Sequence, residues 1–207
     1  MVQVSFLRPI DQFFGARRFL DSFKEYLQSA DFDELLISVA FAKTGPLLRA
    51  QPFIREWRRR GKQVKAIFGV DMQGTSKQAL EFALVNFDEV YITHSTSHST
   101  FHPKFYLFVG EESAVCIHGS HNLTVGGTET NLEGGTIIQI TRPEDEATFQ
   151  EALSCWTSLL PADCEMTRRL DVELLDELVT IYAQKADYRE AELATLKQNL
   201  TSVLVKK

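Results

Sequence analysis

Apolar positions along the first 160 residues repeat in two ways, and the two kinds of repeat alternate. Helical spacing of apolar residues occurs in three segments, residues 11–28, 46–60 and 76–87. Between and after them lie short, mostly apolar runs of strand length, residues 34–41, 63–69 and 88–93. Strands that are apolar on both sides are typical of a parallel sheet covered on both faces. The pattern therefore predicts an α/β fold, with a β-sheet sandwiched between helices.

The rhythm changes after these segments, where two strands follow one another without a helix between them. Residues 102–109 and 113–119 are separated by only three residues, which predicts an antiparallel hairpin. A further strand is expected at residues 134–140, and a helix after Pro143. The sheet is therefore expected to be mixed, with parallel and antiparallel strands.

The chain is expected to form one domain over residues 1–160 and a helical C-terminal extension over residues 161–207. The tail is acidic, because residues 142–207 hold 8 Lys and Arg against 13 Asp and Glu, and most of the net charge of −6 lies there. This charge is unlike a surface coated with DNA-binding basic residues. The local basic run at residues 58–62 is typical of a solvated helix end.

Other bulk features point to a folded protein of the cytoplasm. Hydrophobic residues make up 44% of the chain, which is ample for a core. No apolar run approaches the ~20 residues needed to cross a bilayer. The N-terminus lacks the apolar core of a signal peptide. We therefore expect a cytoplasmic address, with the three cysteines as free thiols.

The hairpin is expected to bring His102 and Lys104 together. If its turn is centred on Glu111, His102 faces Ser120 and Lys104 faces His118 across the two strands. Strand side chains alternate with period two, so His102 and Lys104 share one face. An imidazole and an ammonium group would then meet at one end of the sheet.

Such a pair is suited to phosphate chemistry. A neutral imidazole is a nucleophile or base near neutral pH, and Lys104 adds a fixed cation. The loop at residues 119–127 adds hydroxyl, amide and backbone N–H donors. Glu133 can hold the second ring nitrogen of His102 and fix its tautomer. Together these groups predict a cradle for a tetrahedral oxyanion, with phosphate as the best fit.

At these positions the sequence resembles the phospholipase D superfamily. The shared pattern is H-x-K, then G-S-x-N, then a later acidic residue, here His102-Pro103-Lys104, Gly119-Ser120-His121-Asn122 and Glu133. The spacing is closest to the metal-independent nucleases of that superfamily, including its restriction endonuclease branch. The resemblance covers residues 1–160. It departs at one position, where Val109 stands in place of the family aspartate.

The resemblance implies a mechanism and a set of site residues. His102 attacks phosphorus and forms a phosphohistidine, a second histidine protonates the leaving oxygen, and water releases the product. Lys104 and Asn122 bind the non-bridging oxygens, and no metal or other cofactor is implied. The catalytic residues it implies are His102, Lys104, Ser120, Asn122 and Glu133, and the substrate-binding residues are Gly119, His121 and Thr124.

The resemblance also implies partners. The family uses two H-x-K motifs for each active site and this chain has one, which implies a homodimer with the two His102 rings facing across a twofold axis. DNA is the expected substrate, in a restriction or defence system. The sequence has no evident recognition motif, so a separate specificity or helicase subunit is the expected source of target choice. No membrane partner is expected.

Alternative interpretations of the same residues remain open. His94, His98 and His102 are four residues apart, as in a helical zinc site, but Pro103 disfavours a helix there. His94 and His98 are otherwise loop residues near the phosphate path. Asp71 follows a strand, where open sheets bind ligands. For function, the alternatives are a phospholipid hydrolase or phosphatidyltransferase, and a catalytically silent nucleic-acid-binding assembly module whose helical tail docks a partner.

Overall fold

The structure is a computed structural model that describes residues 1–95 and 99–178. The chain divides into two compact units, Met1–Leu170 and Asp171–Lys207. In the second unit, residues 172–178 are helical. The greater part of the expected helical extension, residues 179–207, lies outside the described residues.

A mixed sheet forms the centre of the first unit. Its strands lie in the order β1-β7-β6-β5-β2-β3-β4-β8. Their bounds are β1 Gln3–Leu7, β2 Glu34–Val39, β3 Gln63–Gly69, β4 Glu89–Thr93, β5 Lys104–Val109, β6 Ser113–Gly119, β7 Gly135–Thr141 and β8 Thr167–Arg169. Neighbours β2, β3 and β4 are parallel, and the other neighbouring pairs are antiparallel. The prediction of a mixed sheet is confirmed.

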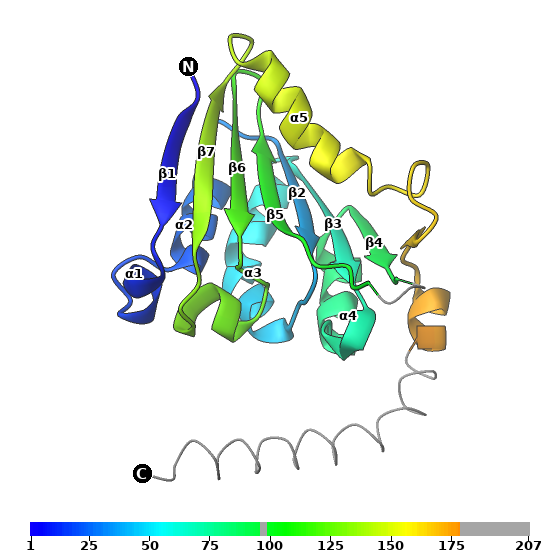
Figure 1. The fold of residues 1–207 in the computed structure, drawn as a ribbon. Helices are drawn as coiled ribbons and strands as arrows, with labels where there is room; N and C mark the ends of the chain where they lie inside the picture. Colours follow the sequence, from blue (N-terminus) through cyan, green and yellow to red (C-terminus); the bar gives the residue numbers. More distant parts are fainter. Residues whose placement is uncertain (96–98, 179–207) are drawn as a thin grey trace, which may run out of the picture. The chain divides into compact units, whose positions relative to one another are not determined.

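Helices cover both faces of this sheet, as Figure 1 shows. Their bounds are α1 Pro9–Phe13, α2 Phe19–Gln28, α3 Thr44–Arg59, α4 Lys77–Asn86 and α5 Glu146–Thr157, with short turns η1 Asp71–Gln73 and η2 Gly126–Thr130. Helices α2, α3 and α4 lie on one face and α5 on the other. On the first face Phe23 packs against Tyr106 and Phe108 of β5. On the second face Leu107 belongs to a cluster with Trp156 of α5. The predicted α/β sandwich is therefore correct.

Three elements differ from the sequence prediction. The helix expected over residues 11–28 is two helices, because the chain turns at Gly15, whose φ is +73°. The side chain of Gln12 accepts a hydrogen bond from the Phe19 backbone N–H (3.1 Å) and holds the start of α2. Strands β1 and β8 are additions at the two ends of the sheet. Strand β8, which follows residue 160, pairs with β4.

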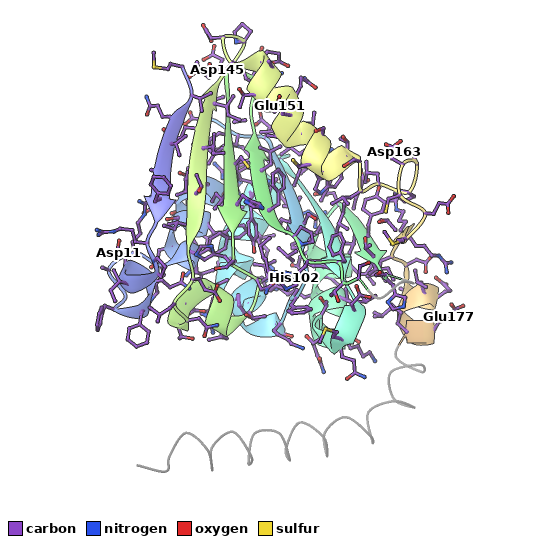
Figure 2. The ribbon with its side chains drawn as sticks, viewed as in Figure 1. Asp11, His102, Asp145, Glu151, Asp163 and Glu177 are labelled. Atoms are coloured by element: carbon purple, nitrogen blue, oxygen red, sulfur yellow. The ribbon has the colours of Figure 1, made fainter. Side chains whose placement is uncertain are left out.

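The topology brings the ends of several strands together at one edge of the sheet, the edge where the parallel strands finish. Parallel strands β2, β3 and β4 all end at this edge. Because β5 is antiparallel to β2 and β6 antiparallel to β5, β5 begins and β6 ends there too. Figure 2 shows His102 at this edge and Asp145 at the opposite end of the strands. Loops that are distant in sequence therefore meet around His102.

Candidate active site

The register of the hairpin differs by one residue from the prediction. Phe105, and not Lys104, pairs with His118, and Val109 pairs with Ala114. Four residues, 110–113, therefore lie between the two members of the last pair. The Gly110 N–H donates a hydrogen bond to the Ser113 carbonyl (2.9 Å), which closes the turn. Paired residues share a face of the sheet, so His118 lies on the α5 face with Phe105. Lys104 points to the opposite face, and the predicted pairing of Lys104 with His118 is wrong.

His102 and Lys104 are in contact. His102 is exposed and lies two residues before Lys104, the buried first residue of β5. The carbonyl of Pro103, between them, accepts a hydrogen bond from the Ala40 N–H (2.8 Å) and ties this segment to the end of β2. The Lys104 Nζ atom lies 2.7 Å from Nδ1, 2.9 Å from Nε2 and 3.0 Å from the backbone oxygen of His102. The strand start thus holds an ammonium group against an imidazole.

The electrostatics of this pair favour a neutral imidazole. Partial burial of the ring and the positive charge of Lys104 lower the pKa of His102 below its usual 6.5. Burial likewise lowers the pKa of Lys104, and the negative charge of Glu133 opposes that shift. A neutral imidazole keeps a lone pair that can attack an electrophile. The pair therefore combines a nucleophile with a nearby cation.

Ser120 and Glu133 form a second hydrogen-bonded group. The Ser120 hydroxyl donates to the Glu133 carboxylate and accepts from the Gly134 N–H (3.1 Å). The other carboxylate oxygen of Glu133 accepts from the Asn131 amide (3.1 Å), a residue that sequence reasoning did not single out. Both acceptor oxygens of Glu133 are thus engaged. The predicted contact between Glu133 and the ring of His102 is not formed within this chain.

Gly119 has a steric role at this corner. A Cβ atom there would lie 2.3 Å from the carbonyl oxygen of Gly134 and 2.5 Å from the Cα of Gly135. No side chain fits at such distances, so glycine permits the close approach of β6 and β7. This approach holds Ser120 next to Glu133.

Asn122 is oriented by a backbone contact from a distant part of the chain. Its Oδ1 atom accepts a hydrogen bond from the Phe41 N–H (3.1 Å), 81 residues earlier. The Phe41 ring lies edge-on to the His102 ring, with centroids 5.9 Å apart. With Oδ1 occupied, the amide NH₂ group of Asn122 can donate to a ligand. Sequence reasoning missed Phe41, because its part is played by a backbone group that has no side-chain signature.

His121, expected to touch substrate, instead lies in the core. Its side chain is 1% exposed and stacks on Phe19, with ring centroids 4.9 Å apart. Neither ring nitrogen has a hydrogen-bond partner in the structure, and burial lowers the pKa of His121 to about 4. In the G-S-x-N segment, Ser120 is exposed and His121 is buried. The predicted substrate contact of His121 is therefore wrong.

Thr124 serves the loop itself. Its Oγ1 atom accepts a hydrogen bond from the Gly127 N–H (3.0 Å), and its carbonyl accepts from the Thr128 N–H (2.9 Å). These bonds start the turn η2. Thr124 thus shapes the loop that follows Asn122.

Val109 lies far from this group. It ends β5, five residues after Lys104, which at the usual rise in a strand is ~16 Å. There it packs against the cluster that contains Trp156 of α5. Position 109 therefore lies at the other end of β5 from His102.

The zinc alternative depends on His98, which lies outside the described residues. Within residues 1–95 and 99–178, no three or more His, Cys, Asp or Glu side chains are grouped so that they could hold a metal ion. Over the same ranges, no helix is long and apolar enough to cross a membrane.

No protein-family model matches the sequence, and no curated protein matches it. Solved structures do match the fold. The chain is similar to NucT from Helicobacter pylori, with 17% identity and a TM-score of 0.56 over 82% of this chain and all of that one. It is similar to Nuc from Salmonella typhimurium, a phospholipase D family member, with 15% identity and a TM-score of 0.51 over 82% of this chain and 97% of that one.

A third similar structure is the phosphatidylserine synthase of Haemophilus influenzae Rd KW20, with 14% identity and a TM-score of 0.52. The match covers 90% of this chain and 46% of that one. At sequence identities this low, structural similarity shows a shared fold but not a shared activity. Together with the mixed sheet and its strand order, these similarities show that this chain has a phospholipase D-like fold.

Proposed function

We propose that this protein is a metal-independent phosphodiesterase that cleaves DNA through a phosphohistidine intermediate. The observation that carries the proposal is the contact of His102 with Lys104 at one sheet edge, beside Phe41. The backbone of Phe41 binds Asn122, so this amide belongs to the same edge. A nucleophile, a cation and an amide donor around one point match the needs of a phosphate whose charge grows during displacement. The Ser120–Glu133 pair, whose charge acts on Lys104, borders the same point.

The first step begins with the neutral ring of His102. An arriving phosphodiester draws the Lys104 ammonium toward its non-bridging oxygens, which frees the imidazole lone pair. A ring nitrogen then forms a bond to phosphorus while the bond from phosphorus to the leaving oxygen breaks. The NH₂ group of Asn122, aimed by the Phe41 N–H, donates to a non-bridging oxygen.

The leaving oxygen must take up a proton, and His102 cannot supply it once it is bonded to phosphorus. In this proposal the His102 of a second copy of the chain supplies it, in a twofold homodimer. That second ring enters the reaction as an imidazolium, a form that the negative charge of the bound phosphodiester stabilises, while the attacking ring is neutral. Water then attacks the phosphohistidine, the bond between phosphorus and nitrogen breaks, and the second imidazole takes the proton from water. Two imidazoles and two lysines supply the acid, base and positive charge.

The setting of the activity is part of the proposal. A cytoplasmic endonuclease of a restriction or defence system would cut DNA, with a separate specificity or helicase subunit choosing the target. The similarity in fold to Nuc, a phospholipase D family member, supports the phosphodiesterase activity on which this setting depends.

Incubation of the purified chain with labelled DNA in excess EDTA tests the proposal. Cleavage should continue in the chelator and be lost in His102→Ala, while His118→Ala, which changes the exposed histidine on the α5 face, should cleave normally. Label that stays on the protein in base and is lost in acid would identify a phosphohistidine, because its bond between phosphorus and nitrogen is labile in acid. Cleavage by His102→Ala, or its abolition by EDTA, would refute the proposal.

The fold similarity to a phosphatidylserine synthase favours one alternative, phospholipid hydrolysis or phosphatidyl transfer by the same residues. Incubation with phosphatidylcholine and phosphatidylserine vesicles in place of DNA distinguishes phospholipid turnover from DNA cleavage. Turnover of lipid without cleavage of DNA would support the alternative. DNA binding without turnover of either substrate would support a silent assembly module.

A further inference from the structure

A second polar group lies on the same sheet edge, outside the candidate active site. Asp71 follows β3 and His94 follows β4. The Oδ1 atom of Asp71 lies 2.6 Å from Nδ1 of His94 and accepts the Ser95 N–H (3.1 Å). The Oδ2 atom accepts the Phe101 N–H (2.9 Å). One carboxylate therefore joins the His94 ring to the residue that precedes His102.

The pair has one buried and one open member. The Asp71 side chain is 7% exposed, whereas that of His94 is 63% exposed. The backbone of His94 is held as well, because its N–H donates to the Met166 carbonyl (3.2 Å). A carboxylate that accepts from Nδ1 leaves Nε2 at the open side of the ring. The imidazole is thus held in place and presented to solvent.

Distance separates this group from the reacting phosphorus. Strands β5 and β4 are three places apart in the sheet, which at the usual strand spacing is ~14 Å between their ends. His102 precedes β5, and its neighbour Phe101 shares the Asp71 carboxylate with His94, so His94 lies beside the reacting phosphorus rather than at it. A DNA strand carries a phosphate every ~3.4 Å along the duplex axis, so another phosphate a few nucleotides away falls within this range.

We infer that His94, positioned by Asp71, binds a phosphate that flanks the cleaved one. The Nε2–H of the ring donates to that phosphate while Nδ1–H donates to Asp71, so an imidazolium is held between two anions. This inference rests on the proposed function and narrows its substrate to a strand with several phosphodiesters. A small diester with a single phosphate would occupy the place beside His102 and would not reach His94.

Two substrates separate the roles of the two histidines. His94→Gln should raise KM for a labelled oligonucleotide about ten-fold and leave kcat within about two-fold, because a charged contact is worth roughly this much. For bis(p-nitrophenyl) phosphate, a diester with one phosphate, both constants should be unchanged. His118→Gln, at an exposed histidine on the α5 face, is the matched control and should change neither substrate. An equal loss on both substrates, or no change on the oligonucleotide, would overturn the inference.

A binding measurement keeps this test independent of turnover. In a His102→Ala background, the affinity for the oligonucleotide should fall about ten-fold when His94→Gln is added. The slope of log K against log salt should become less steep by about 0.7–0.9, the value for one lost phosphate contact. Unchanged affinity and slope would refute the role of His94 even if the protein cleaved neither substrate. Cleavage that survives His102→Ala would instead refute the proposed function.

Asp71 is a positioning residue in this arrangement. Asp71→Asn should lower the affinity for the oligonucleotide and the salt slope in the same way as His94→Gln. The variant with both substitutions should bind no more weakly than His94→Gln alone, because each substitution removes the same phosphate contact. A purely structural role for Asp71 would lower thermal stability and leave the salt slope at its wild-type value.

Discussion

The ammonium nitrogen of Lys104 lies 2.7 Å from Nδ1 and 2.9 Å from Nε2 of His102. A neutral imidazole has one acceptor nitrogen, so the ammonium group can pair with only one of the two at a time. The contact favours the neutral ring over the imidazolium, because a second positive charge beside Lys104 would be repelled. The same contact places the cation where an anionic phosphate must come to meet the ring.

Removal of this cation should change the pH dependence of cleavage. Because the pKa of His102 is lowered, the acid limb of kcat/KM should lie below pH 6.5 in the wild type. In Lys104→Met the ring loses a repelling charge, so the limb should move up toward pH 6.5, and kcat should fall by about 10²-fold. The measurement is kcat/KM for cleavage from pH 4.5 to pH 8. A limb that stays in place would contradict an effect of Lys104 on His102.

Asn122 offers a substitution that preserves the fold contact and removes the donor. Asn122→Asp keeps an oxygen to accept the Phe41 N–H and replaces the NH₂ group by a second oxygen. Turnover should fall by about 10²–10³-fold, because a donor to the phosphate becomes an acceptor that repels it. Steady-state kinetics give the loss, and thermal melting shows whether the fold is retained. Near-normal turnover in a folded Asn122→Asp protein would refute a role of the amide in binding phosphate.

The buried ring of His121 should make the protein sensitive to acid. The folded chain protonates His121 only near pH 4, whereas the unfolded chain does so near pH 6.5. Between these values the unfolded state binds more protons, so the free energy of unfolding falls as pH falls. The full effect is about 3 kcal/mol.

Urea denaturation at several pH values between 7 and 4 measures this effect. In His121→Leu the free energy of unfolding should fall less over that interval, because the titrating ring is gone. His118→Leu changes an exposed histidine on the α5 face and should leave the wild-type pH dependence intact. Equal pH dependence in the wild type and His121→Leu would show that His121 does not carry the effect.

An aspartate at position 109, the residue that the resemblance to the phospholipase D superfamily implies there, should not increase activity. Position 109 lies at the far end of β5 from Lys104, half-buried against the cluster of α5. Val109→Asp places a charge there, so the free energy of unfolding should fall by about 1–3 kcal/mol. Below the melting temperature, kcat/KM should equal that of the wild type. A gain in turnover would show that position 109 does act on the site.

Local sequence patterns were sufficient to predict most helices and strands. The bounds of β3 and β6 coincide with the predicted strands, since each is a short apolar run closed by glycine. The bounds of α4 lie one residue inside the predicted ones, and Ser76 caps it through a hydrogen bond to the Ala79 N–H (3.3 Å). Such features depend on residues close together in the chain, which is why periodicity and capping residues reveal them.

Strands β1 and β8, the two outermost strands of the sheet, were not predicted from the sequence. In β1 polar Gln3 and Ser5 alternate with apolar Val4 and Phe6, but the run is only five residues long and four of them are exposed, so the strand is a weak signal. Strand β8 has three residues, Thr167–Arg169, two of them arginine. Their strand structure comes from pairing with β7 and β4, and not from their own composition.

By itself, the sequence determined the α/β class, the order of helices and strands from residue 34 to residue 160, and the H-x-K and G-S-x-N motifs. Only the tertiary structure decided the one-residue shift of the hairpin, the burial of His121, the Phe41 contact to Asn122 and the link from Asp71 to His94 and Phe101. The physical reason is range. Periodicity reflects interactions within a few residues, whereas these contacts join segments that meet only after the whole sheet has formed.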